Sequence, residues 1–379
     1  MDFDMLDAFG LDPSVVHLNH GAFGVAPRSV RAVADAWRER AERNPHRFNR
    51  VEISDLVARA RSRAAEYLGV PPSEVGWVRN VSEGVSCVLG ALDLAPGDEL
   101  VTSRHGYGAV HMALGHWAQR RGAIVREVAF SVGASDDEIV EAYVAECSRR
   151  TRIVVVDQIT SPTASVLPVE AIAAMVDAPV LVDAAHVPGS LPVQVADLGA
   201  TWWVGNLHKW AYTPRGTALL WRSESAPATW PNVLSWQIED GYAESFDYPG
   251  TWDYAAWIAV PDGLDFWAEV GGWRQVRELT SVVEAGQRHL ADALGTSLDG
   301  LPETAAPTMR LVRLPDGVLE GPSDAQRLYE RLSVEHRVET APVHFDGLGY
   351  LRVAAAPYNT LDDYDRLAEA VTFELRNFT

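Results

Sequence analysis

The basic residues of this chain are almost all of one kind. Of its 32 lysines and arginines, 31 are arginines and one is a lysine, Lys209. Codon bias in a GC-rich genome explains arginine wherever only positive charge is needed, but it does not explain one retained lysine. A guanidinium stays charged and is a poor nucleophile, whereas an amine can lose its proton. Lys209 is therefore a candidate for amine chemistry, above all for a Schiff base.

A second candidate lies 26 residues earlier, in the segment PVLVDAAHVPG. The apolar run Val180–Val182 ends in Asp183, and His186 follows. A carboxylate at the end of a buried strand is costly unless it has a partner, so Asp183 either caps a helix or pairs with a cation. Pyridoxal phosphate requires a lysine for its aldehyde and a carboxylate that keeps its pyridine nitrogen protonated.

The elements that would position these residues alternate in type. Helical stretches separate short apolar runs, which is typical of an α/β domain with a mostly parallel sheet. Open sheets of this kind bind ligands at the carboxyl ends of their strands, and Lys209 follows such an end. The runs predicted as strands are Glu99–Thr102, Ala123–Ala129, Arg152–Val156, Pro179–Val182, Thr201–Val204 and Thr217–Trp221.

The pattern changes around Gly250–Asp262, where a long helical segment leads into mixed strands and helices. We expect a large cofactor-binding domain over residues 16–255. Residues 1–15 and 256–379 would then form a smaller domain of the α+β type. A chain of 379 residues is long enough for two such units.

Composition excludes several classes of protein. The net charge of −20 disfavours nucleic acids and anionic membranes as partners, and no apolar run is long enough to span a bilayer. Two cysteines are too few for a disulfide scaffold or a cysteine-based zinc site, and the first residues do not resemble a signal peptide. We expect a cytoplasmic protein. The spacing of His105, His111 and His116 does not place them on one helical face, so we expect no metal site.

Four separated motifs together resemble the class V aminotransferases of pyridoxal fold type I. They are the Asp-x-x-His sequence at Asp183, the Asn-x-His-Lys turn at Lys209, LNHGAFGVAPRSV at Leu18–Val30 and LRVAAAPYNT at Leu351–Thr360. The nearest resemblance is to the isopenicillin-N-epimerase-like subgroup. It implies a large domain with a mostly parallel seven-stranded sheet flanked by helices, a smaller C-terminal α+β domain, and pyridoxal 5'-phosphate (PLP) as cofactor.

The resemblance also assigns residues to the cofactor. Val81 and Ser82 match a helix N-terminus that holds the cofactor phosphate, although Ser82 is equally explained as a simple helix cap. Tyr107 matches the aromatic residue that stacks on the pyridine ring, although a single tyrosine more often serves packing. Ser161 matches the position near the phenolic oxygen of the cofactor.

Further matches lie around the lysine and in a later loop. Asn206 and His208 match phosphate ligands that directly precede Lys209. In the segment FDYPGTWD, Gly250 and Thr251 match residues that reach the phosphate bound by the other subunit. The resemblance therefore implies a homodimer with shared active sites.

Substrate contacts are expected from the opening and closing motifs. Arg352 in the closing motif matches the arginine that binds the α-carboxylate of the substrate. The planar fork of an arginine suits bidentate binding of a carboxylate. Asn19 and His20 are expected near the substrate, and Arg47 in the segment NPHRFNR resembles a substrate-facing arginine of the subgroup. The partner would then be a small-molecule amino-acid substrate.

The catalytic residues predicted from this constellation are Lys209, Asp183 and His186. The loop before Arg352 reads TAPVHFDGLGY and lacks the cysteine of persulfide-forming desulfurases. We expect C–S cleavage by β-elimination of a cysteine S-conjugate in bacterial secondary metabolism, as in similar enzymes of lincosamide pathways. Decarboxylation-coupled oxidative deamination of such a conjugate, epimerisation and transamination remain alternatives. A non-catalytic pyridoxal-fold binding protein is a more distant one.

Overall fold

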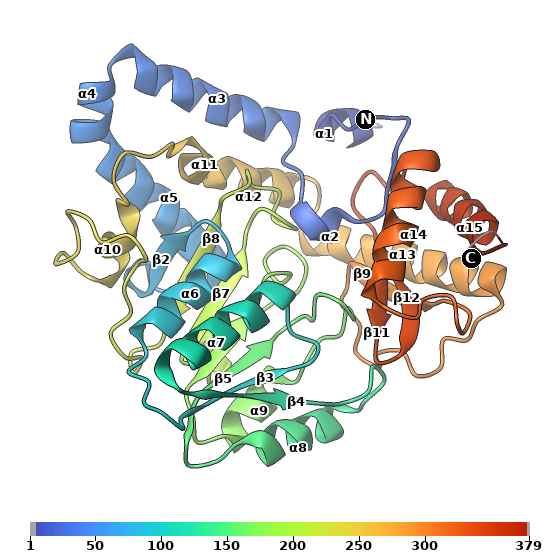
Figure 1. The fold of residues 1–379 in the computed structure, drawn as a ribbon. Helices are drawn as coiled ribbons and strands as arrows, with labels where there is room; N and C mark the ends of the chain where they lie inside the picture. Colours follow the sequence, from blue (N-terminus) through green and yellow to red (C-terminus); the bar gives the residue numbers. More distant parts are fainter. Residues whose placement is uncertain (1–4, 377–379) are drawn as a thin grey trace.

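A seven-stranded sheet forms the centre of the larger part of the molecule (Figure 1). The structure is a computed structural model and describes residues 5–376. Strand β8 is antiparallel to both of its neighbours, and the remaining pairs are parallel, which confirms the predicted mostly parallel sheet. In spatial order the strands are β2 (Val75–Val78), β8 (Ala218–Arg222), β7 (Trp202–Asn206), β6 (Val180–Asp183), β5 (Thr151–Asp157), β3 (Glu99–Ser103) and β4 (Ile124–Val128).

Both faces of this sheet are covered. Alternate residues of β5 enter two different cores: Val154 and Val156 pack on one face, Ile153 and Val155 on the other. Strands buried on both faces are continuously apolar, which is the pattern seen in the sequence. One face carries α6 (Val81–Ala91) and α7 (Gly108–Arg121), and the opposite face carries α5 (Ile53–Leu68), α8 (Asp136–Glu146) and α9 (Val169–Met175).

The C-terminal part builds a smaller antiparallel sheet. Its order is β11 (Ala341–Phe345), β12 (Leu348–Ala354) and β9 (Met309–Arg313). Helices α13 (Trp273–Leu294), α14 (Pro322–Glu335) and α15 (Leu361–Arg376) bury one face of it, drawn in orange and red in Figure 1. This confirms the predicted smaller C-terminal domain. Among residues 5–376, no helix combines the length and apolar character that a bilayer crossing would require.

The remaining elements complete these two parts. The strand β1 (Val16–His17) pairs in parallel with β10 (Val338–Glu339), far along the chain. The remaining helices are α1 (Met5–Phe9), α2 (His20–Phe23), α3 (Arg28–Arg43), α4 (Pro45–Arg47), α10 (Tyr242–Asp247), α11 (Ala255–Ile258) and α12 (Val260–Glu269). A π-helical turn covers Phe48–Glu52, and 3₁₀ turns cover Pro72–Glu74 and Val195–Asp197.

The division of the chain into domains remains a proposal, and the packing of these elements suggests different boundaries. Val16 and Leu18 lie in the core of the smaller part, whereas Trp257 and Leu264 lie in a core of the larger part. We therefore propose to move the boundaries from residues 16 and 255 to residue 19 and to Gly271–Gly272, where two left-handed glycines precede α13. Residues 1–4, which we assigned to the smaller domain, lie outside the described residues.

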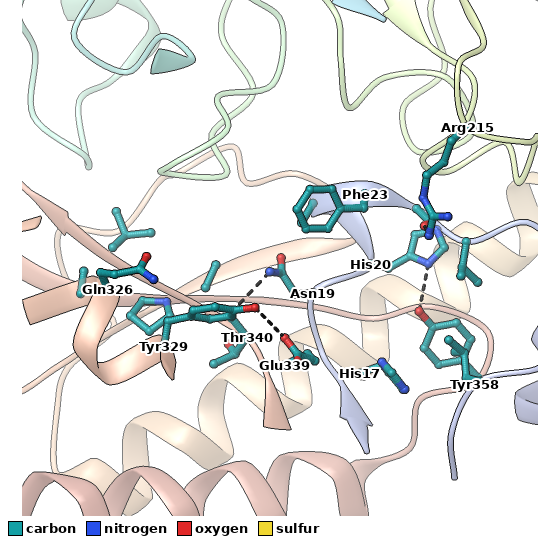
Figure 2. Close-up of a pocket in the computed structure, with 18 of the residues that line it drawn as sticks. His17, Asn19, His20, Phe23, Arg215, Gln326, Tyr329, Glu339, Thr340 and Tyr358 are labelled. Atoms are coloured by element: carbon teal, nitrogen blue, oxygen red, sulfur yellow. Dashed lines mark hydrogen bonds between the residues drawn. The ribbon is translucent and has the colours of Figure 1, made fainter. Parts of the chain in front are cut away.

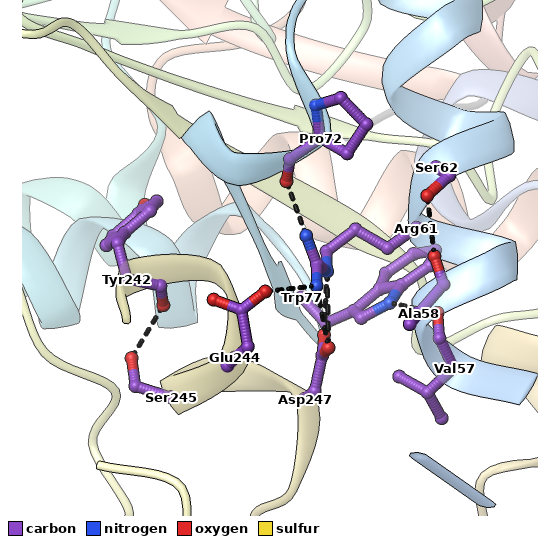
Figure 3. Close-up of polar contacts among 10 residues, drawn as sticks. All are labelled: Val57, Ala58, Arg61, Ser62, Pro72, Trp77, Tyr242, Glu244, Ser245 and Asp247. Carbon is purple, nitrogen blue, oxygen red and sulfur yellow. Dashed lines mark hydrogen bonds and ion pairs between the residues drawn. The ribbon is translucent and has the colours of Figure 1, made fainter. Parts of the chain in front are cut away.

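A buried ion pair joins α10 to helix α5 (Figure 3). The Arg61 guanidinium of α5 donates to both carboxylate oxygens of Asp247, at 3.0 and 3.2 Å, to Glu244 at 3.0 Å, and to the backbone carbonyl of Pro72. The side chains of Arg61 and Asp247 are each 6% exposed. The loop with the Gly250 motif begins directly after Asp247, so this pair fixes the start of that loop.

Replacing Arg61 by Met is expected to lower the free energy of unfolding by about 3–5 kcal/mol, because Asp247 would stay buried without its partner. Urea denaturation followed by tryptophan fluorescence measures this. The matched control is Arg63→Met on the same helix, whose partners are exposed and whose loss should cost at most about 1 kcal/mol. Equal effects of the two substitutions would contradict a special role for the buried pair.

Candidate active site

Most of the predicted site residues line one cavity of about 330 Å³. It lies at the carboxyl ends of β5, β6 and β7, beside the N-terminus of α6, where an open α/β sheet is expected to bind its ligand. The smaller domain contributes one residue to it. The predicted residues that the structure brings together here are Val81, Ser82, Tyr107, Ser161, Asp183, His186, Asn206, His208, Lys209 and Arg352.

The amine of Lys209 is buried inside this cavity. Its Nζ lies 3.2 Å from Nε2 of His186, and the residue is 9% exposed. Burial lowers the pKa of Lys209 to about 7, the nearby Arg352 cation acts in the same direction, and Asp183 opposes them. A substantial fraction of the amine is therefore unprotonated at neutral pH, which is the form that attacks an aldehyde or accepts a proton.

Two buried polar atoms beside the lysine have no partner within the described chain. Asp183 uses Oδ1 to accept the N–H of Ala185 at 3.0 Å, but its Oδ2 is unpaired, and so is Nδ1 of His186. Burial raises the pKa of Asp183 to about 6. Buried polar atoms normally have partners, so these atoms fit a ligand that supplies them. A protonated pyridine nitrogen would supply the donor that Asp183 lacks.

The N-terminus of α6 also lines the cavity. Asn80 caps this eleven-residue helix by accepting the N–H of Glu83 at 3.0 Å. The side-chain oxygen of Asn206 accepts the N–H of Val81 at 3.0 Å, so Asn206 holds the helix against β7. The N–H of Ser82 is one of the first-turn donors that a helix leaves free. Such a terminus favours an anion, which fits the phosphate of PLP.

Arg352 links the two domains at the cavity. From β12 it donates to the backbone carbonyl of Ser161, to the Ser161 hydroxyl at 3.3 Å and to Oδ1 of Asn19 at 2.9 Å. Burial lowers the pKa of Arg352 to about 10, so it remains charged at neutral pH. These bonds leave the Nε–H and one Nη2–H, two neighbouring donors that suit a carboxylate.

His20 does not line this cavity. Its Nε2 donates to the backbone carbonyl of Lys209 at 2.8 Å, and its Nδ1 lies 2.9 Å from the hydroxyl of Tyr358. Burial lowers the pKa of His20 to about 4, so the ring is neutral. Both ring nitrogens are therefore occupied: Nε2 holds the backbone of the lysine turn, and Nδ1 bonds to Tyr358. The predicted substrate contacts of His20 and Asn19 remain predictions, and both residues line a neighbouring cavity instead.

Three further predicted residues lie away from the cavity of their own chain. Arg47 is exposed on α4, where it pairs with Glu52 at 3.0 Å. Gly250 and Thr251 belong to a surface loop after α10. Their assigned roles remain predictions, and for Gly250 and Thr251 these roles require a second subunit.

Sequence reasoning missed Asp157. It ends β5 and is the register partner of Asp183 on the neighbouring strand β6, and both carboxyls line the cavity. Neighbouring strands lie about 4.8 Å apart, so two buried charges there repel each other strongly. Burial, together with Asp183, raises the pKa of Asp157 well above its usual range. The repeated ending of two strands, VVVD and VLVD, was the signal that could have revealed the pair.

Comparisons with known proteins match this chain over most of its length. The family model for class V aminotransferases matches residues 26–310. A probable chloroplastic L-cysteine desulfhydrase of Arabidopsis thaliana is 30% identical, over 97% of this chain and 84% of the relative. An isopenicillin N epimerase of Streptomyces clavuligerus is 29% identical, over 95% of each chain. These matches confirm the resemblance that the motifs predicted.

Solved structures share the fold. A variant of C-DES with glycine covalently linked to its PLP cofactor superimposes with a TM-score of 0.80 at 19% identity, covering 99% of both chains. The complex of the cystine C–S lyase C-DES with its product cysteine persulfide gives a TM-score of 0.78 at 20% identity, covering 97% of this chain and 98% of the other. At these identities the likeness concerns the fold, and it confirms the prediction of pyridoxal fold type I.

The acidic pair Asp157 and Asp183 predicts the direction in which the stability of the protein changes with pH. Both carboxyls have pKa values above those of an unfolded chain, so the folded protein retains protons that unfolding releases, and its stability falls as the pH rises through the raised pKa values, which for Asp183 is about 6. Asp157→Asn removes one of these groups while keeping its shape. We expect this variant to raise the Tm of the cofactor-free protein at pH 8 by at least about 2 °C, with a smaller gain at pH 5.

Thermal denaturation across this pH range measures the effect. The matched control is Asp177→Asn, an exposed aspartate just before β6, which should leave the Tm unchanged at every pH. A gain that is the same at pH 5 and pH 8 would show that the titration of Asp157 is not its cause.

Proposed function

This chain belongs to the class V aminotransferase family and is a PLP-dependent enzyme, and from that premise we propose that it cleaves the C–S bond of a cysteine S-conjugate by β-elimination. The conjugate and water would yield a free thiol, pyruvate and ammonium. Bacterial secondary metabolism is the setting that we propose for this reaction. The names of relatives, which include L-cysteine desulfhydrases, support C–S cleavage.

The observation that carries this proposal is a buried amine base in a cavity without a thiol. Cys87 is buried within α6, and burial raises its pKa to about 12; Cys147 follows α8. Neither cysteine lines the cavity. Transfer of the substrate sulfur to an enzyme cysteine needs a reactive thiolate beside that sulfur, and no cysteine among the described residues lines the cavity. Elimination needs only a base at Cα and a departing thiolate.

The residues of the chain divide this work. When bound, PLP supplies an electron sink for the negative charge that develops at Cα. Arg352 binds the substrate carboxylate and fixes Cα near the lysine turn. Lys209 removes the Cα proton, and the low pKa of its amine makes it a competent base at neutral pH. As the proton leaves, the Cβ–S bond breaks and the thiolate departs. Asp183 keeps its carboxylate against the ring nitrogen.

The alternative reactions differ in what they need after proton removal. Isopenicillin N epimerases are among the relatives at 29–30% identity, so epimerisation is the second candidate. It requires a second proton donor on the opposite face of Cα. Decarboxylation-coupled deamination would instead release the carboxylate that Arg352 binds, and transamination returns a proton to the cofactor. Product analysis separates all of them.

We also propose that the enzyme works as a homodimer with shared active sites. Phe23 and Tyr107 line the cavity and yet are 73% and 47% exposed, so one side of the site is open in a single chain. Met112, on the helix α7 that Tyr107 precedes, is 78% exposed. A second subunit that covers these side chains would bring Gly250 and Thr251 to the cofactor phosphate.

Purified enzyme supplied with S-substituted cysteines is expected to release thiol and pyruvate in equal amounts. Mass spectrometry of the products in deuterated water would instead show deuterium at an inverted Cα for epimerisation, or the loss of one carbon for decarboxylation. Lys209→Ala should lower turnover by about 10⁴-fold or more and remove the yellow colour of bound cofactor. Lys209→Arg is the control. It keeps the positive charge but lacks a nucleophilic amine, so its turnover should fall as far as that of Lys209→Ala.

Shared sites predict complementation between two inactive variants. Lys209→Ala and Thr251→Asp each damage a different subunit's contribution to one site. Co-expression should therefore restore about a quarter of wild-type activity, because half of the dimers are mixed and each has one intact site. Activity would be measured on the separately purified and the co-expressed proteins. No restoration in dimers that two different affinity tags show to be mixed would contradict shared sites.

A further inference from the structure

A second cavity, of about 790 Å³, adjoins the catalytic one (Figure 2). Ala22 and Phe23 line both cavities, and Asn19 in the second accepts a hydrogen bond from Arg352 in the first. An amino acid whose carboxylate is held by Arg352 would therefore lie at the junction of the two. The second cavity begins where the side chain of that amino acid could extend.

Its size exceeds what free cysteine requires. The catalytic cavity of about 330 Å³ is at the lower end of the range for small-molecule pockets, enough for a cofactor and a short amino acid. The side chain of cysteine adds one carbon and one sulfur atom, which would leave the second cavity filled with water. A long or bulky substituent on the sulfur would use it.

The walls come from three segments that lie far apart in the sequence. The N-terminal motif provides one wall, the face of α14 a second, and β10 with β11 a third. Apolar side chains make up much of the lining, including Val25, Pro322, Ala325, Pro342 and Val343. This composition is typical of a ligand site that buries carbon atoms and directs them with a few polar groups.

Polar groups also line the cavity. Figure 2 shows Gln326 and Tyr329 on the side away from His20 and Arg215, with Glu339 next to Tyr329. Glu339 accepts the hydroxyl of Tyr329 at 3.2 Å and that of Ser333 at 2.6 Å, which orients its carboxylate. Each carboxylate oxygen can accept a further hydrogen bond. Glu339 is the one carboxylate among the residues that line this cavity, so its end attracts hydrogen-bond donors, above all cationic ones.

We propose that this second cavity binds the sulfur substituent of the substrate, and that the substituent is bulky and carries an amine or hydroxyl donor for Glu339. This inference rests on the proposed C–S cleavage, from which it takes its substrate class, a cysteine S-conjugate. It adds that the substrate is larger than cysteine and that Gln326 and Glu339 determine specificity. The binding of the substituent is separable from turnover, because substrate analogues also change the visible absorption of the bound cofactor.

The test compares cysteine, S-methylcysteine, S-benzylcysteine and S-(4-aminobenzyl)cysteine on the holoenzyme. Their dissociation constants come from the change in the visible band, and kcat/KM comes from thiol release. The two benzyl compounds should bind roughly ten- to a hundredfold more tightly than S-methylcysteine, because a phenyl ring is buried. In the wild type, S-(4-aminobenzyl)cysteine should bind more tightly than S-benzylcysteine, because its amino group reaches Glu339. The Glu339→Gln variant should lose this difference in affinity and should bind S-benzylcysteine as the wild type does.

A variant that fills the cavity provides the second arm. Gln326→Trp, at an exposed position of α14, should weaken both benzyl compounds about tenfold or more and leave S-methylcysteine nearly unchanged. The matched control is Val334→Trp on the same helix, which is 78% exposed and outside the lining. Equal affinity for all four compounds, or equal effects of the two tryptophans, would overturn the subsite.

These outcomes also separate the two proposals. If the benzyl compounds bind tightly but release no thiol, the subsite stands and the proposed elimination fails. If thiol is released from all compounds with equal kcat/KM and equal affinity, the elimination stands and the subsite fails.

Discussion

The burial of one amine among charged groups governs this site. Lys209 is shielded from solvent and faces the cation of Arg352, and both effects lower its pKa, whereas the carboxylate of Asp183 acts in the opposite direction; the balance brings the pKa to about 7. A solvated lysine would stay protonated at neutral pH and could not act. The neutral state of His186 belongs to the same balance, because burial and the adjacent cations hold the pKa of His186 well below its usual range. Everything that keeps water out of the cavity therefore contributes to the reactivity of the amine.

Domain packing is part of this arrangement. Arg352 belongs to β12 of the smaller sheet, and it contacts Ser161 on the loop after β5 and Asn19 in the opening motif. His20, one residue further, fixes the backbone of Lys209. The opening motif thus touches both Arg352 and the lysine turn. A substrate carboxylate that changes the hydrogen bonds of Arg352 would act directly on the contact between the domains, which couples substrate binding to the geometry around the amine.

The sequence revealed the parts of the site that a local pattern can carry. The solitary lysine and the strand-ending Asp183 were recognisable because each is unusual in its own segment, and the alternation of apolar runs predicted the sheet that places both at one edge. Asp157 was missed because its significance depends on the register between β5 and β6, which pairs it with Asp183. The role of His20 was also beyond reach, since both of its hydrogen bonds join residues far apart in the chain. The second cavity likewise depends on how three distant segments pack.

The chain has a net charge of −20 and yet uses an anionic cofactor. The charges that line the cavity, rather than the net charge, set the electric field at the cofactor. At physiological ionic strength, charges on the outer surface act over only about 8 Å, so most of the acidic surface does not reach a buried phosphate. Inside, the N-terminus of α6 and the cation of Arg352 face the cavity, whereas Asp157 and Asp183 lie at the carboxyl ends of β5 and β6. One cavity therefore presents positive potential to a phosphate and acidic groups to a ring nitrogen. A ligand that carries both, with the two separated by a rigid ring, matches this division better than a simple anion or a simple cation.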